Sequence, residues 1–96
     1  MDVRQALACA LRTIRNARGL TQEDFSNVSS RTYLSTLERG LKSPTMDKMQ
    51  ALAEVLDVHP LTIMALTFIT AEDSSADELL ATVKRELRNV GAQRVG

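Results

Sequence analysis

The sequence predicts an all-helical fold, and three features of the chain favour it. Apolar residues recur at intervals of three and four along most of the chain, which is the spacing of one face of a helix. Only 3% of the residues are aromatic and none is tryptophan, so aliphatic side chains must fill the core. Capping residues and glycines mark the ends of the apolar segments. The length, 96 residues, suits one small domain.

Three helical segments are expected in the first half of the chain. Apolar residues at helical spacing run through residues 3–18, and Gly19 ends this helix. Thr21 is the expected N-cap of a short second helix, which the polar sequence at residues 27–30 ends. Ser29 or Ser30 caps a third helix that runs to about residue 39.

Three further helices are expected in the second half. Thr45 caps a helix over residues 46–56. Pro60 suits the first position of a fifth helix, which reaches residue 69 and is apolar on nearly all sides. After a linker at residues 71–74, a capping box formed by Ser75 and Glu78 begins a sixth helix. The apolar stripe of this helix consists of Leu80, Val83, Leu87 and Val90.

The charge distribution favours one class of binding partner, and the hydropathy predicts a cellular location. Twelve Lys and Arg balance twelve Asp and Glu, yet residues 1–45 carry a net charge of +3 and residues 46–96 a net charge of −3. This asymmetry favours a polyanion as the partner of the first half. The start of the chain has no apolar signal segment, and no run approaches 18 apolar residues. We therefore expect a cytoplasmic protein without membrane contact.

The chain lacks the residue patterns of an enzyme. The single cysteine, Cys9, excludes an intramolecular disulfide and a cysteine-cluster zinc site. The one histidine, His59, precedes Pro60 and is expected to cap a helix. No Ser/His/Asp set, cluster of metal ligands or phosphate-binding glycine loop is recognisable. We expect no catalysis, no cofactor and no metal.

The helix expected over residues 30–39 has two different sides. On a helical wheel, Leu37 and Glu38 lie within about 60° of Leu34, so these residues mark the docking side. A carboxylate on that side needs a cation, and we expect Glu38 to pair with Arg15 of the first helix. The opposite side suits either ordinary solvent exposure or the DNA major groove, where short hydroxyl and guanidinium donors reach base edges. It carries Thr32, Thr36 and Arg39.

These residues belong to motifs that occur in a familiar order. The motifs are Arg18-Gly19-Leu20-Thr21-Gln22-Glu23, Arg31-Thr32-Tyr33-Leu34-Ser35, Leu37-Glu38-Arg39-Gly40 and Ser43-Pro44-Thr45. Over roughly residues 8–69 the chain resembles the Xre/Cro/lambda-repressor helix-turn-helix family. The second motif also resembles the controller proteins of restriction–modification systems. The resemblance implies a five-helix lambda-repressor-like domain over residues 1–70, which residues 71–96 extend by a linker and a sixth helix.

The resemblance also implies a sequence-specific transcriptional regulator. It would bind a near-palindromic operator as a homodimer, with the helix over residues 30–39 in the major groove and half-sites about 34–36 Å apart. By motif position, the base-reading residues are Arg31, Thr32, Ser35 and Thr36. The phosphate-binding residues are Gln22, Tyr33, Arg39 and Lys42, and the structural ion pair is Arg15 and Glu38. The turn before the reading helix is about two residues shorter than usual and lacks glycine, so Asn27 is the candidate for a left-handed conformation there.

The helix over residues 60–69 is too apolar for one core contact. We expect part of it to meet a second copy across a two-fold axis, whereas the alternative is complete burial under the C-terminal helix. The expected dimer contacts are Leu61, Leu66, Phe68 and Ile69. The alternative function is an antitoxin-type interaction module with autoregulatory DNA binding, in which the acidic half or the C-terminal helix holds a toxin. A regulator acting beside a promoter would instead contact RNA polymerase.

Overall fold

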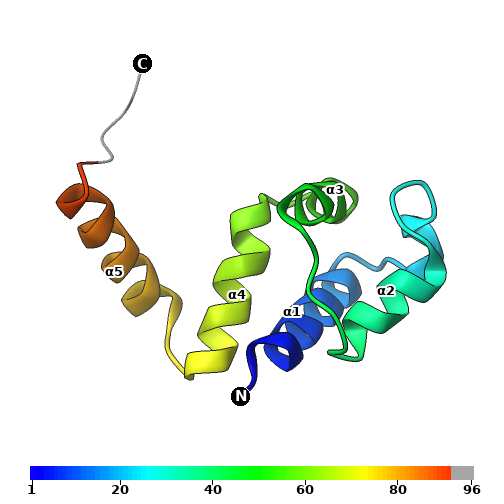
Figure 1. Ribbon diagram of the computed structural model, residues 1–96, viewed down its shortest axis with the longest axis horizontal. Coiled ribbons are helices and arrows are strands. Elements are labelled where there is room, and N and C mark those ends of the chain that lie inside the picture. Colours follow the sequence, from blue (N-terminus) through cyan, green and yellow to red (C-terminus); the bar gives the residue numbers. More distant parts are fainter. Residues whose placement is uncertain (92–96) are drawn as a thin grey trace.

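The computed structural model describes residues 1–91 and contains five α-helices and one 3-10 turn (Figure 1). The predicted all-helical class is confirmed, and no strand occurs in the described part of the chain. Residues 92–96, the end of the expected C-terminal region, lie outside the described residues. The elements are α1 Val3–Ala17, η1 Gln22–Phe25, α2 Arg31–Glu38, α3 Met46–Leu56, α4 Pro60–Glu72 and α5 Ala76–Asn89.

The predicted count of six helices is wrong, because the second segment folds as the single 3-10 turn η1. Its start matches the expected cap: the backbone N–H of Thr21 donates to Asp24 Oδ2 at 2.7 Å. Phe25 at its end is only 1% exposed and anchors the turn in the core. The C-terminal helix is therefore α5, the fifth α-helix of the described chain.

The connection between η1 and α2 closes without a left-handed residue. The expectation for Asn27 is wrong, since Asp57 and Asp73 are the non-glycine residues with positive φ in the described chain. The backbone N–H groups of Val28 and Ser29 instead both donate to the carbonyl oxygen of Phe25, at 3.0 and 2.9 Å. Hydrogen bonds to the anchored Phe25 thus shape this short turn.

The helix starts follow the predicted caps. Side chains at these positions accept a hydrogen bond from the first turn of their helix, which satisfies a donor that the helix itself leaves unpaired. They are Ser30 for α2, Thr45 for α3, His59 for α4 and Ser75 for α5. One boundary differs from the prediction: α4 continues to Glu72 and ends at Asp73, whose φ is 53°. The linker to α5 is correspondingly short.

One apolar core lies where α1 crosses α4 and where α2, α3 and η1 close around them. Apolar residues at helical spacing in α1 and α3 supply much of it, except at the first position of each helix, and the stripe of the C-terminal helix contributes none of it. Val3 is 47% exposed and Met46 is 85% exposed, because each lies at the first position of its helix and projects beyond the core. The core consists of Leu7, Leu11, Ile14, Phe25, Leu34, Leu37, Leu52, Ala53, Leu56 and Ile63.

The last helix, α5, extends from the far end of α4 and stands apart from the other helices (Figure 1). It packs mainly against α4, and none of its residues is buried. The radius of gyration is accordingly 14.3 Å, compared with about 12 Å expected for a compact chain of this length. Helices 1–4 and η1 thus form a compact body, from which α5 projects.

No single helix of residues 1–91 is long and apolar enough to cross a membrane. Together α3 and α4 have sufficient length and apolar composition, but their axes are bent by 101° at the break between them.

Candidate nucleic-acid interface

An ion pair between α1 and α2 underlies the candidate interface. Arg15 Nε donates to Glu38 Oε2 at 2.7 Å, and Arg15 Nη2 donates to Glu38 Oε1 at 2.9 Å. Their side chains are 16% and 4% exposed. The hydrogen bonds to Glu38 raise the pKa of Arg15 above its usual value, against the opposing effect of burial. Because a bidentate pair fixes orientation as well as distance, this pair sets the angle of α2 on α1.

Two more hydrogen bonds connect this pair to the segment before α2. Arg15 Nη1 donates to the carbonyl oxygen of Leu20 at 3.1 Å. Gln22 Nε2 donates to Glu38 Oε1 at 3.1 Å, so one amide hydrogen of this expected phosphate ligand is directed inward. The amide carries a second hydrogen. Three elements, α1, η1 and α2, therefore meet at one buried carboxylate.

The side of α2 opposite this carboxylate faces outward. The predicted docking orientation is confirmed, since Leu34 is 1% exposed and Leu37 is fully buried. Among the expected base readers, Arg31 and Thr32 are exposed, whereas Ser35 and Thr36 are half-buried. The hydroxyl of Thr36 donates to the carbonyl oxygen of Thr32 at 2.7 Å. These four side chains belong to consecutive turns of the same helix.

Arg31 has an acidic neighbour outside the helix. Its Nη1 lies 3.6 Å from Glu23 Oε1, and both side chains are about three-quarters exposed. An exposed ion pair of this kind contributes little to stability and is screened by salt. Arg31 can therefore exchange Glu23 for another anion or a base edge at small cost.

Basic side chains gather around Tyr33, near the start of α2. Lys42 Nζ, from the loop after α2, lies 6.0 Å from the centroid of the Tyr33 ring, and Lys48 Nζ lies 5.2 Å from it. Lys48 Nζ also donates to the carbonyl oxygen of Val28 at 2.7 Å. Arg39, the C-cap of α2, is exposed at the other end of the helix.

Lys48 makes a contact between elements that its position in the sequence did not indicate. Lys48 is not among the residues that the sequence analysis singles out, but its side chain is half-buried and connects α3 to the turn before α2. Helical spacing identifies a face and says nothing of a neighbouring turn that approaches it. The one available signal was the unusually short turn, which leaves Val28 near the start of α3.

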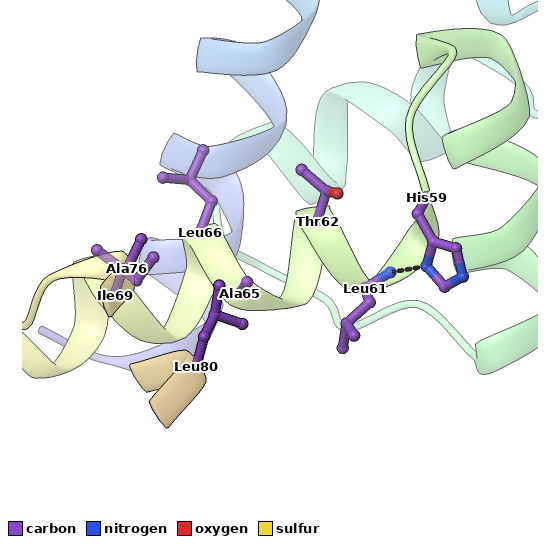
Figure 2. Close-up of a pocket in the computed structure, with 8 residues that line it drawn as sticks. All are labelled: His59, Leu61, Thr62, Ala65, Leu66, Ile69, Ala76 and Leu80. Atoms are coloured by element: carbon purple, nitrogen blue, oxygen red, sulfur yellow. Dashed lines mark hydrogen bonds between the residues drawn. The ribbon is translucent and has the colours of Figure 1, made fainter. Parts of the chain in front are cut away.

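An apolar groove lies between α4 and α5, with a volume of about 470 Å³ (Figure 2). Of the expected dimer contacts, Leu61, Leu66 and Ile69 line it together. Phe68 does not; it lines a separate hollow against α1. The imidazole Nδ1 of His59 caps the helix by accepting a hydrogen bond from the backbone of Leu61 at 2.9 Å. The alternative expectation, in which the C-terminal helix buries the whole of α4, is not observed, since Leu61 is 52% exposed.

No metal site is recognisable in the part of the chain that the structure describes. No three His, Cys, Asp or Glu side chains of residues 1–91 gather in one place. The surface around α2 carries hydroxyl, amide, guanidinium and ammonium groups, with the Glu23 carboxylate beside Arg31. The hydrogen-bond donors among these groups suit an anionic, hydrogen-bonding partner.

Comparison with known proteins gives consistent similarities. The family model described as Helix-turn-helix matches residues 11–63. An uncharacterised HTH-type transcriptional regulator of Sinorhizobium fredii, y4dJ, is 36% identical over 69 residues, which cover 70% of this chain and 90% of that protein. Control protein C.SmaI of Serratia marcescens is 34% identical over 59 residues, covering 59% of this chain and 70% of that protein.

A solved structure has the same fold. The clp gene regulator ClgR from Corynebacterium glutamicum aligns with a TM-score of 0.66, covering 97% of this chain and 98% of its own. The sequences are 24% identical in this alignment. The likeness covers nearly the whole chain and shows the fold.

Proposed function

Because the chain belongs to the Xre-like helix-turn-helix family of transcriptional regulators, we propose that it binds a near-palindromic DNA operator as a homodimer, with α2 in the major groove. The observation that carries this proposal is the way α2 is held. The Arg15–Glu38 pair and the buried Leu34 fix one side of the helix, and its other side presents only polar and cationic groups.

Each outward residue has a proposed role on DNA. Arg31, Thr32, Ser35 and Thr36 contact base edges, since their side chains share the outward turns of α2. Phosphates are held by Lys42 and Tyr33 near the start of α2, by Arg39 at its other end, and by the second amide hydrogen of Gln22. Arg15 and Glu38 are structural. Binding to genomic DNA also places the working protein in the cytoplasm.

Base reading is tested by selecting bound sequences from random DNA. The wild-type protein is expected to select two inverted half-sites with centres about 34–36 Å apart. The double variant Arg31→Ala, Thr36→Ala should lose preference at symmetric positions in both half-sites, by about 1–3 kcal/mol for each lost contact. Its affinity for non-specific DNA should remain. The control is Arg85→Ala, at an exposed position in α5. If the double variant bound every DNA sequence more weakly by the same factor, the assignment of Arg31 and Thr36 to base reading would be refuted.

Phosphate binding is tested by the salt dependence of affinity. Arg39→Ala and Lys42→Ala should each weaken binding on all sequences alike and reduce the slope of log affinity against log salt by about one. The reason is that a protein with one phosphate-binding cation fewer releases one counterion fewer from the DNA when it binds. Lys84→Ala, an exposed lysine on α5, should leave the slope unchanged. If both test variants kept the wild-type slope, other residues of the protein would bind the phosphates.

The similarity to Control protein C.SmaI supports a controller role for this regulator. In such a role the dimer acts at a promoter, by occupying it or by contacting RNA polymerase. In this proposal, control works through protein concentration and dimerisation, because binding by a dimer depends on the concentration of its protomers.

A further inference from the structure

The projecting helix α5 has an apolar side that no other part of residues 1–91 covers. Leu80 is 44% exposed, Leu87 is 47% exposed and Val90 is 75% exposed. They lie on one side of the helix, because spacings of seven and three residues at about 100° per residue keep them within about 80° of one another. An isolated helix of 14 residues is marginal in water, and packing of its apolar face provides most of its stability. This face therefore needs a partner surface.

The groove between α4 and α5 is a matching surface. The residues lining it carry no carboxylate, ammonium or guanidinium group. On α5 only Ala76 and Leu80, in the first turns, form its wall (Figure 2). Leu87 and Val90 continue the apolar stripe beyond the groove. One end of α5 thus builds a groove, and the other end carries an uncovered stripe of the same character.

We propose that the distal part of α5 from each protomer, carrying Leu87, packs in the α4–α5 groove of a second copy. This reciprocal contact rests on the homodimer of the proposed function and specifies its interface. A two-fold axis that places one helix in the partner's groove places the partner's helix in the first groove. The same two-fold rotation then covers the groove and the exposed stripe of each copy. The contact includes Leu61, Leu66 and Ile69, which line the groove.

The size of the interface favours this arrangement over contact through α4 alone. A stable interface uses about 20–30 residues from each side. The 13 residues of α4 are too few, particularly since Ile63 and Thr67 are buried in the core of their own protomer. With these two left out, helices α4 and α5 together offer 25 residues in adjoining helices.

The linker holds α5 in a position from which it reaches a partner. The left-handed Asp73 ends α4, and the backbone N–H of Ser74 donates to the carbonyl oxygen of Ile69 at 3.1 Å. Ser75 and Glu78 then form a reciprocal capping box that starts α5 directly. Because both ends of this linker are fixed by hydrogen bonds, α5 keeps its projecting direction and does not fold back over its own α4.

The decisive variant is Leu87→Glu, since Leu87 lies outside its own protomer's groove. Burial of a carboxylate at two symmetric contacts should raise the dimer dissociation constant at least about 100-fold in sedimentation equilibrium. The matched control is Ala81→Glu, which adds the same group at an exposed position outside the stripe and should leave the constant unchanged. Operator selection by Leu87→Glu should still return the half-site sequence, because the DNA-binding body is untouched.

Mixing two variants shows whether the contact is made between copies. Leu87→Glu and the groove variant Ile69→Lys should each be monomeric alone, and their mixture should form a heterodimer in which the carboxylate meets the ammonium group. Absence of a heterodimer would overturn the exchange of α5. A Leu87→Glu protein that dimerises like wild type would also overturn it while leaving the proposed homodimer intact. A wild-type protein that stays monomeric at all concentrations would instead refute the homodimer itself.

Discussion

Glu38→Ala is expected to lower the free energy of unfolding by about 3–5 kcal/mol, a large share of the stability of a small domain. The variant leaves the guanidinium of Arg15, only 16% exposed, without its carboxylate. It also removes the acceptor of the Gln22 amide, so the connections among α1, η1 and α2 are lost together. For a chain of this size the loss corresponds to a fall in Tm of at least about 12 °C.

Thermal unfolding followed by circular dichroism measures this effect. Glu54→Ala is the matched control, because Glu54 is exposed on α3 and its loss should change Tm by no more than about 3 °C. Glu38→Gln, which keeps the shape and one acceptor but removes the charge, should fall between the two. If the Tm of Glu38→Ala stayed close to that of the control, the ion pair would not hold α2 in place.

Ile69→Glu is expected to lower operator affinity by about 10²–10⁴-fold. Ile69 lines the apolar groove between α4 and α5, where a carboxylate would lose its hydration against the apolar α5 of the second copy. The variant should therefore be monomeric. A monomer binds each half-site in a separate event and loses the advantage of two linked contacts, although each DNA-binding body remains intact.

Light scattering, circular dichroism and a DNA mobility-shift assay together measure these effects. The helical signal should be close to wild type, since Ile69 lies outside the buried core. Ala81→Glu, on the exposed surface of α5, is the control for added charge. A dimeric Ile69→Glu protein with full operator affinity would exclude this side of α4 from the interface. A variant that unfolds would show that Ile69 supports its own protomer.

Local signals in the sequence were sufficient for most helix boundaries. The caps Ser30, Thr45 and Ser75 act on the backbone within one turn, and this chemistry depends on neighbours in the chain alone. The docking side of α2 was predictable for a similar reason, because Leu34 and Leu37 have only one way to share a buried face.

Features set by tertiary packing were not predictable in the same way. The reduction of the second helix to η1 depends on how Phe25 fits the core, and the position of Lys48 depends on the approach of a distant turn. That Phe68 meets α1 while Ile69 meets α5 follows from where these two helices lie against α4. A helical wheel contains none of this information, since it describes each helix without its neighbours.

The internal hydrogen bond of Thr36 limits the bases that this residue can recognise. Its hydroxyl hydrogen is directed to the carbonyl oxygen of Thr32, 2.7 Å away. Toward DNA it then offers only an oxygen lone pair and a methyl group. In the proposed complex the lone pair can accept from the amino group of adenine or cytosine, and the methyl group can contact that of thymine. Guanine presents two acceptors and no donor in the major groove, so it is the base least compatible with Thr36 in this conformation.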